Sequence, residues 1–213
     1  MRITEGYSEG FTIVELVVVI AIIGIVAAVT IPGLILQLPK FRVNGAVRNL
    51  ASDMQWAKMM AVKENNDFVM VFDSANNRYL IYDDNCSNGF STSGSYNSSY
   101  DCTNTGETSD NLLVKTVNLS DISKGIIFGG VNTGVRETDC VGNITDPVTF
   151  SADNFTFQTN ALSNKLGAVY LIPSVDDNAA TANPRLRAIT VIQTGRVKAW
   201  KLESKTPCSW SQQ

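Results

Sequence analysis

The sequence predicts an α+β protein, in which one long amino-terminal helix packs on an antiparallel β-sheet head. Two observations lead to this prediction. Residues 11–31 form an almost uncharged apolar run, and many short apolar or alternating segments, separated by turn residues, follow from residue 67 onward. Because the helical and strand signals occupy separate parts of the chain, helix and sheet are expected to segregate rather than alternate.

The apolar run is long enough to cross a membrane. It holds 21 residues from 11 to 31, with Glu15 as its one ionisable group. At about 1.5 Å per residue such a helix is about 32 Å long, which matches the hydrocarbon layer of a bilayer. A conventional cleaved signal peptide has a shorter apolar stretch and small residues after it. We therefore expect residues 11–38 to form a single membrane-spanning helix.

Glu15 is the unusual residue of this span. A carboxylate inside an apolar segment costs a few kcal/mol unless it is paired or neutralised. One interpretation is a glutamate that is protonated or that reaches the membrane surface from its place near the helix start. The other is a glutamate that pairs with a positive charge brought by a second, similar helix.

A second, amphipathic helix is expected over residues 39–66. Its apolar residues recur at intervals of three and four, which places them on one face that should pack against the sheet. These residues are Val43, Val47, Leu50, Met54, Ala57 and Ala61. Pro32 and Pro39 lack an amide donor, so we expect the helix to break or bend at both.

The remainder, residues 67–213, is expected to form a β-rich globular head. Segments 68–72 and 78–82 flank a polar turn and predict a hairpin. Further strands are expected at 112–119, 125–128, 148–150, 155–158, 168–172, 188–192 and 196–202.

Four cysteines lie in the head and none forms a C-x-x-C pair. They are Cys86, Cys102, Cys140 and Cys208. If this region lies outside the cytoplasm, two disulfides with three alternative connectivities are expected, and the polar segment 83–111 becomes a disulfide-stabilised loop.

The composition argues against an enzyme. The chain has no histidine, which excludes Ser-His, Cys-His and H-E-x-x-H chemistry, and no glycine-rich phosphate loop is present. We predict no cofactor and no metal. Asp83, Asn85 and Ser87 alternate like calcium ligands, but Gly94 stands where a bidentate glutamate is needed. The net charge of −3 gives no general attraction to nucleic acid.

The string Gly10-Phe11-Thr12-Ile13-Val14-Glu15, followed by the apolar run, resembles the class III signal of type IV pilins and type II secretion pseudopilins. The resemblance implies the type IV pilin fold, with residues 1–10 as a leader peptide. A prepilin peptidase would cut after Gly10 and methylate Phe11, and Glu15 would pair with the terminal amine of a neighbouring subunit. It also implies that Pro32 begins a segment able to melt in the filament.

The same resemblance implies partners and a location. The partners would be prepilin peptidase, other pilins or pseudopilins and an inner-membrane assembly platform. The chain would be a single-pass protein of the bacterial inner membrane with its head in the periplasm or outside, and part of a pilus or pseudopilus after assembly.

The head is most similar to the GspH/FimT-type minor pseudopilins. Lys58 stands where that group has an arginine, and a glycine-arginine turn lies at Gly195-Arg196. The predicted function is therefore a minor pilin or pseudopilin of a type IV pilus-like or type II secretion filament, with these two systems left open. The alternative is a FimT-like minor pilin that binds DNA for natural transformation through Arg196, Lys198 and Lys201.

Overall fold

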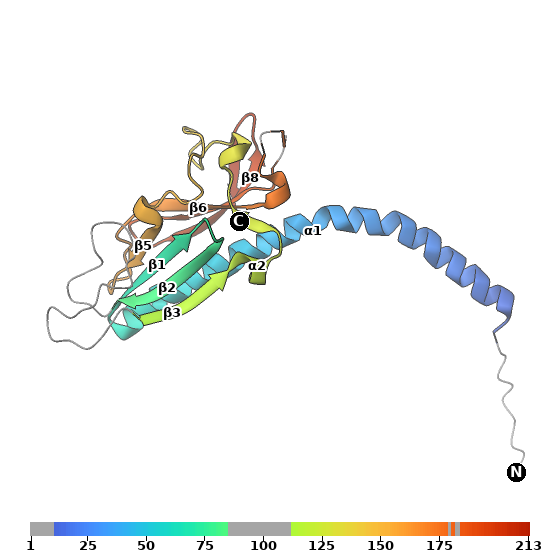
Figure 1. Cartoon of the computed structure of the whole chain (residues 1–213), viewed down its shortest axis with the longest axis horizontal. Helices are drawn as coiled ribbons and strands as arrows, with labels where there is room; N and C mark the ends of the chain where they lie inside the picture. The colour runs from blue at the N-terminus through green and yellow to red at the C-terminus, as the bar shows by residue number, and fades with distance from the viewer. Residues whose placement is uncertain (1–10, 85–111, 179, 182–183) are drawn as a thin grey trace, which may run out of the picture. The chain divides into compact units, whose positions relative to one another are not determined.

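The computed structural model describes residues 11–84, 112–178, 180–181 and 184–213. The chain divides into two compact units, Met1–Leu38 and Pro39–Gln213. Helix α1 (Ile13–Glu64) begins in the first unit and ends in the second, which also holds every described strand (Figure 1). The predicted α+β class, with one long helix and antiparallel sheets, is confirmed.

Helix α1 continues through Pro32 and Pro39, so neither proline ends it, whereas the predicted bend at these residues stays a prediction. Each proline removes one amide donor, yet the residues on either side keep theirs and most of them favour helix. Pro32 is exposed and Pro39 is half-buried, so their rings sit on the helix surface. A proline in this setting costs a hydrogen bond without ending the helix.

The predicted apolar stripe of the second unit is confirmed. All six of its residues, Val43, Val47, Leu50, Met54, Ala57 and Ala61, are completely buried, and Ala46 joins them. They form one core with side chains from both sheets. The small alanines allow the strands to approach the helix closely, whereas Leu50 and Met54 fill the space between them.

Sheet A has four strands in the order β3-β2-β1-β5. These are β1 (Asp67–Asp73), β2 (Arg78–Asp84), β3 (Leu112–Asn118) and β5 (Asn154–Phe157). The predicted hairpin pairs β1 with β2 from Asp67 opposite Asp84 to Asp73 opposite Arg78. Figure 1 shows the last turns of α1 running along β1, β2 and β3.

Sheet B has five strands in the order β4-β6-β7-β8-β9. These are β4 (Ile126–Phe128), β6 (Gly167–Pro173), β7 (Arg187–Val191), β8 (Val197–Ser204) and β9 (Ser209–Gln212). Both of its faces are covered: Val169 and Leu171 of β6 belong to the helix-side core, whereas Tyr170 and Ile172 belong to a second core with Leu186. Burial on both faces explains why β6 is apolar throughout instead of alternating.

Three parts of the head differ from the sequence prediction. Residues 148–150 form only an isolated bridge, between Val148 and Val169, rather than a strand. A short helix, α2 (Leu119–Ile122), directly follows β3. Strand β9 was not predicted, because Ser209–Gln212 is short and three of its four residues are polar.

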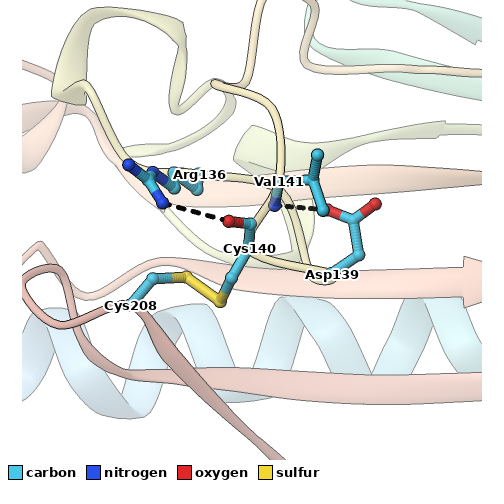
Figure 2. Close-up of a disulfide and its surroundings, with 5 residues drawn as sticks. All are labelled: Arg136, Asp139, Cys140, Val141 and Cys208. Atoms are coloured by element: carbon cyan, nitrogen blue, oxygen red, sulfur yellow. Dashed lines mark hydrogen bonds between the residues drawn. A yellow bond between two sulfur atoms is a disulfide. The ribbon is translucent and has the colours of Figure 1, made fainter.

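A disulfide joins Cys140 to Cys208 (Figure 2). This pair is one of those allowed by the connectivities predicted for the four cysteines. The residues are 68 positions apart, so the bond ties the segment around Cys140 to the turn between β8 and β9. The same segment is held by a hydrogen bond from Arg136 to the Cys140 carbonyl (3.3 Å) and by one from the Val141 amide to Asp139 (3.0 Å). Cys86, Cys102 and most of the predicted loop lie outside the described residues.

Asp53 connects α1 to sheet A. Its carboxylate accepts a hydrogen bond from the Tyr79 hydroxyl on β2 (2.6 Å) and pairs with the Lys115 ammonium on β3 (2.6 Å). Tyr79 is completely buried, and its pKa is raised by burial and by the nearby Asp53 carboxylate. One acidic side chain on the helix therefore satisfies a buried hydroxyl and fixes two strands.

We expect Asp53→Ala to lower the free energy of unfolding of the head by about 1–3 kcal/mol, because the Tyr79 hydroxyl would remain buried without an acceptor. Denaturation of the full chain in detergent, followed by tryptophan fluorescence, measures this change. In a Tyr79→Phe background the same substitution should cost less, because no hydroxyl is left unpaired. An equal loss in both backgrounds would contradict this role.

Candidate functional site

The first turn of α1 contains the residues that the sequence singled out for assembly. Thr12 precedes the helix, and its hydroxyl accepts a hydrogen bond from the Glu15 amide at 3.2 Å. The Leu16 amide donates to the Thr12 carbonyl at 3.2 Å. Thr12 is therefore the N-cap, and Glu15 is the third helical residue, where a negative charge interacts favourably with the helix dipole. The sequence analysis did not identify Thr12 as the cap, although T-x-x-E is the signal for one.

Glu15 stands alone in an exposed apolar surface. It is exposed, as are Phe11 and the large apolar side chains that follow to Leu36. The helix is long and apolar enough to cross a membrane, and none of the described residues buries the span that meets this test. The Thr30 hydroxyl donates to the Val26 carbonyl at 2.8 Å, which hides a second polar group inside the helix.

This arrangement sets a physical requirement. Each valine, leucine or isoleucine left in water forfeits about 1.5–3 kcal/mol relative to burial, so the helix needs an apolar environment. The same environment penalises the Glu15 carboxylate. Phe11 lies four positions before Glu15 and outside the helix, whereas Gly10 lies outside the described residues. The geometry therefore supplies an apolar surface and one carboxylate, both of which need partners.

The second candidate region is the turn between β7 and β8. Gly195 is buried with φ of +68°, and the Lys58 ammonium donates to its carbonyl at 2.9 Å. A Cβ at Gly195 would overlap the Ala161 carbonyl oxygen. The Gly195 amide donates to the Ile192 carbonyl at 2.7 Å. Lys58 and Gly195 are two separate features of the sequence. In the structure they form one contact, which fixes the turn.

The three candidate DNA contacts do not share one surface. Arg196 is exposed beside the turn, and the Lys198 ammonium lies over the Trp200 ring at 5.4 Å from its centre. Successive side chains of a strand point to opposite faces, so Lys201 faces away from Lys198. Lys201 also pairs with Glu203 at 2.7 Å. Arg196 and Lys198 remain together, and DNA binding stays a prediction.

Among the described residues, no group of three or more His, Cys, Asp or Glu side chains is placed to hold a metal ion. Asp83 of the weak calcium pattern is buried, and burial, followed by repulsion from Glu64, raises its pKa. Asn85, Ser87, Gly89 and Gly94 lie outside the described residues.

Comparison with known proteins identifies a motif in the amino-terminal segment. Residues 7–31 match the model of the prokaryotic N-terminal methylation motif. No curated protein matched the chain. Among solved structures, the minor pseudopilin EpsH of the Vibrio cholerae type 2 secretion system is 8% identical, with a TM-score of 0.43, over 74% of this chain and 95% of that one. The type IV minor pilin FimU of Pseudomonas aeruginosa is 12% identical, with a TM-score of 0.40, over 78% and 95%.

The amino-terminal segment therefore carries a prokaryotic N-terminal methylation motif, most of which lies in the exposed apolar part of α1, and an α+β head follows it. The motif ends at residue 31, so it describes the anchor and not the head.

We expect Gly195→Ala to destabilise the head by about 2 kcal/mol or more, because a left-handed φ costs an alanine about 1–2 kcal/mol and the new methyl group would also meet the Ala161 carbonyl. Thermal unfolding of the full chain in detergent measures the loss. Gly142→Ala is the matched control, since its Cβ would meet nothing nearer than Glu137 Oε1 at 3.9 Å. Equal stability of the two variants would contradict the proposed constraint.

Proposed function

We propose that this protein is a non-enzymatic subunit of a filament, a minor pilin or pseudopilin that is held in the membrane until it is assembled. One observation supports this most strongly. The apolar surface of α1 is exposed over its amino-terminal half, and its one charge, Glu15, lies in the first turn next to Phe11. A bilayer covers such a surface in the free subunit, and other helices of the same kind cover it in a filament.

The order of events follows from the motif. A prepilin peptidase cuts after Gly10 and methylates the new amino terminus at Phe11. The cut releases a positive amine immediately before the Thr12 cap, whereas within the uncut chain this nitrogen belongs to a neutral peptide bond. Glu15 of one subunit then pairs with the amine of another, which neutralises both groups inside the apolar filament core. Cleavage thus creates the partner that Glu15 lacks.

The head suits a minor subunit of the GspH/FimT type. The Lys58 contact with Gly195 gives a structural reason for the basic residue and the glycine that the sequence resemblance singled out. A type II secretion pseudopilus and a type IV pilus use the same helix packing, so both remain candidate systems. The head, disulfide-bonded between Cys140 and Cys208, would lie on the outer side of the membrane.

The cleavage site can be tested by mass spectrometry of the mature protein. We expect an amino-terminal peptide that begins with N-methylated Phe11, because the peptidase reads the Gly10-Phe11 junction. A mature terminus at any other residue would show that the cleavage assignment is wrong.

Assembly tests the role of Glu15. We expect Glu15→Ala and Glu15→Gln to be processed normally but to enter filaments at least about tenfold less than the wild type, since breaking a buried ion pair costs several kcal/mol. Quantitative blotting of membrane and filament fractions measures this. Val19→Ala, which shortens an apolar side chain of the same helix, is the control. Normal incorporation of Glu15→Gln would show that charge pairing is not required.

DNA binding is the second candidate function. The observation in its favour is that the rigid Gly195 turn presents the exposed Arg196, with Lys198 two residues along. Cations so placed attract phosphates, and lysine keeps this attraction without the bidentate geometry of arginine.

If this candidate is right, the full chain in detergent binds duplex DNA with an affinity that falls as salt rises, and Arg196→Glu with Lys198→Glu removes the binding. Lys63→Glu with Lys124→Glu makes the same charge change elsewhere and should leave it intact. A wild-type protein without salt-sensitive binding would exclude the DNA function.

A further inference from the structure

Five basic side chains line one pocket of the described head, which shares Lys201, but neither Arg196 nor Lys198, with the predicted DNA contacts. The pocket has a volume of about 360 Å³. Its charged lining residues are Lys40, Arg185, Arg187, Lys201, Glu203 and Lys205. We call it the basic pocket. Five cations and one carboxylate line the pocket, and two of the cations are already paired, Arg185 with Asp176 and Lys201 with Glu203.

Two of the cations are held in fixed positions. Arg187 is 2% exposed, and its guanidinium donates to the Asn44 side-chain oxygen and to the Leu186 carbonyl, both at 2.9 Å. Arg185 makes two hydrogen bonds to Asp176, at 2.6 and 2.7 Å. Pre-positioned guanidinium groups bind a phosphate with little further loss of side-chain entropy.

The buried guanidinium also favours an anion. Burial lowers the pKa of Arg187, and the Glu203 carboxylate opposes this only in part. Glu203 itself is shared, because it accepts hydrogen bonds from Lys201 and from the Ser211 hydroxyl. Glu203 therefore offsets only part of the cost of burying the Arg187 charge, and a negatively charged ligand would offset more of it.

Lys40 fixes where the pocket lies along the chain. It follows Leu38, the last residue of the apolar unit, by two positions, and it contributes to the pocket wall. At about 1.5 Å per helical residue, Lys40 lies about 3 Å beyond Leu38 along the helix. The headgroup region begins where the hydrocarbon ends and is about 5–8 Å thick on each side of a bilayer. Residues 11–38 are about 42 Å long as a helix, which matches a bilayer together with its headgroups, so Lys40 lies at the outer edge of the headgroup region.

We propose that the basic pocket binds the phosphate of an anionic phospholipid headgroup. This inference rests on the membrane anchoring that is part of the proposed function. The bound lipid would hold the base of the head at the membrane surface, and extraction of the subunit into a filament would require its release.

The geometry favours a headgroup over a nucleic acid. Arg187 lies at the back of a recess, where a single phosphate on a flexible lipid reaches it but a stiff duplex does not. The exposed pair Arg196 and Lys198, which would suit DNA, is not among the residues that line the pocket. The two ligand classes thus correspond to different residues and are separable by substitution.

The test uses the full mature chain purified in detergent with a mixture of phosphatidylglycerol and neutral phosphatidylcholine, and native mass spectrometry counts the lipids that remain bound. We expect preferential retention of phosphatidylglycerol. Lys40→Gln with Lys205→Gln should reduce this retention by about fivefold for each lysine removed. Lys63→Gln with Lys124→Gln removes the same charge outside the pocket and should not reduce it. Arg187 is left unchanged because it is part of the folded core.

Two results would overturn the proposal: equal retention by the pocket variant and its control, or complete displacement of phosphatidylglycerol by millimolar inorganic phosphate, which would indicate a site for the free anion. Carbonate extraction of cell membranes distinguishes the proposal from the one it rests on. A chain released by carbonate contradicts the membrane anchor itself, whereas an anchored chain without lipid preference contradicts only the lipid site.

Discussion

An apolar helix with a single carboxylate in its first turn is the constraint on which the rest of this protein depends. Within the part of the chain that the structure describes, nothing buries the amino-terminal half of α1, and its large side chains are exposed from Phe11 to Leu36. Such a surface is stable only in a bilayer or against other helices. In the proposed function Glu15 favours the second environment, because lipid penalises its charge, whereas a neighbouring helix with a free amino terminus would neutralise it.

The head is built to keep its shape while the anchor changes environment. The stripe from Val43 to Ala61 is completely buried, so the second unit is secured to the helix by a continuous core. Asp53 adds polar contacts to two strands, and the Cys140–Cys208 bond secures the turn at the end of β8. Sheet B, buried on both faces, supports the Gly195 turn and contributes to the basic pocket. The folded head therefore holds both surfaces in place.

The parts of the fold that periodicity governs were predictable from the sequence. The stripe on α1 and the β1–β2 hairpin follow the periods of 3.6 and 2, and both agree with the structure. Strand β9 was not predicted, whereas segment 148–150 was predicted as a strand and forms only an isolated bridge. Both errors arise because strand pairing depends on neighbours that are distant in sequence. The unbroken helix at Pro32 and Pro39 shows that a local penalty was outweighed by the residues around it.

The candidate sites also differ in whether the sequence alone could reveal them. Glu15 was recognisable because a charge in an apolar run is conspicuous, and it lies within the residues that match the methylation motif. The basic pocket was not recognisable from the sequence. It combines residues from three distant segments: Lys40 from the helix, Arg185 and Arg187 from around β7, and Lys205 from the β8–β9 turn. Only the fold brings them together. Similarly, the alternation of β8 separates Lys201 from Lys198, which a count of basic residues does not show.

The central claim, that the exposed helix exchanges lipid for the helices of other subunits, is tested most directly by photo-crosslinking from Leu16, next to Glu15. A photoreactive residue at this position should crosslink to residues 11–38 of another pilin-like subunit when the assembly machinery is present, and to lipid alone when it is absent. Lipid adducts alone in the assembled filament would contradict the account.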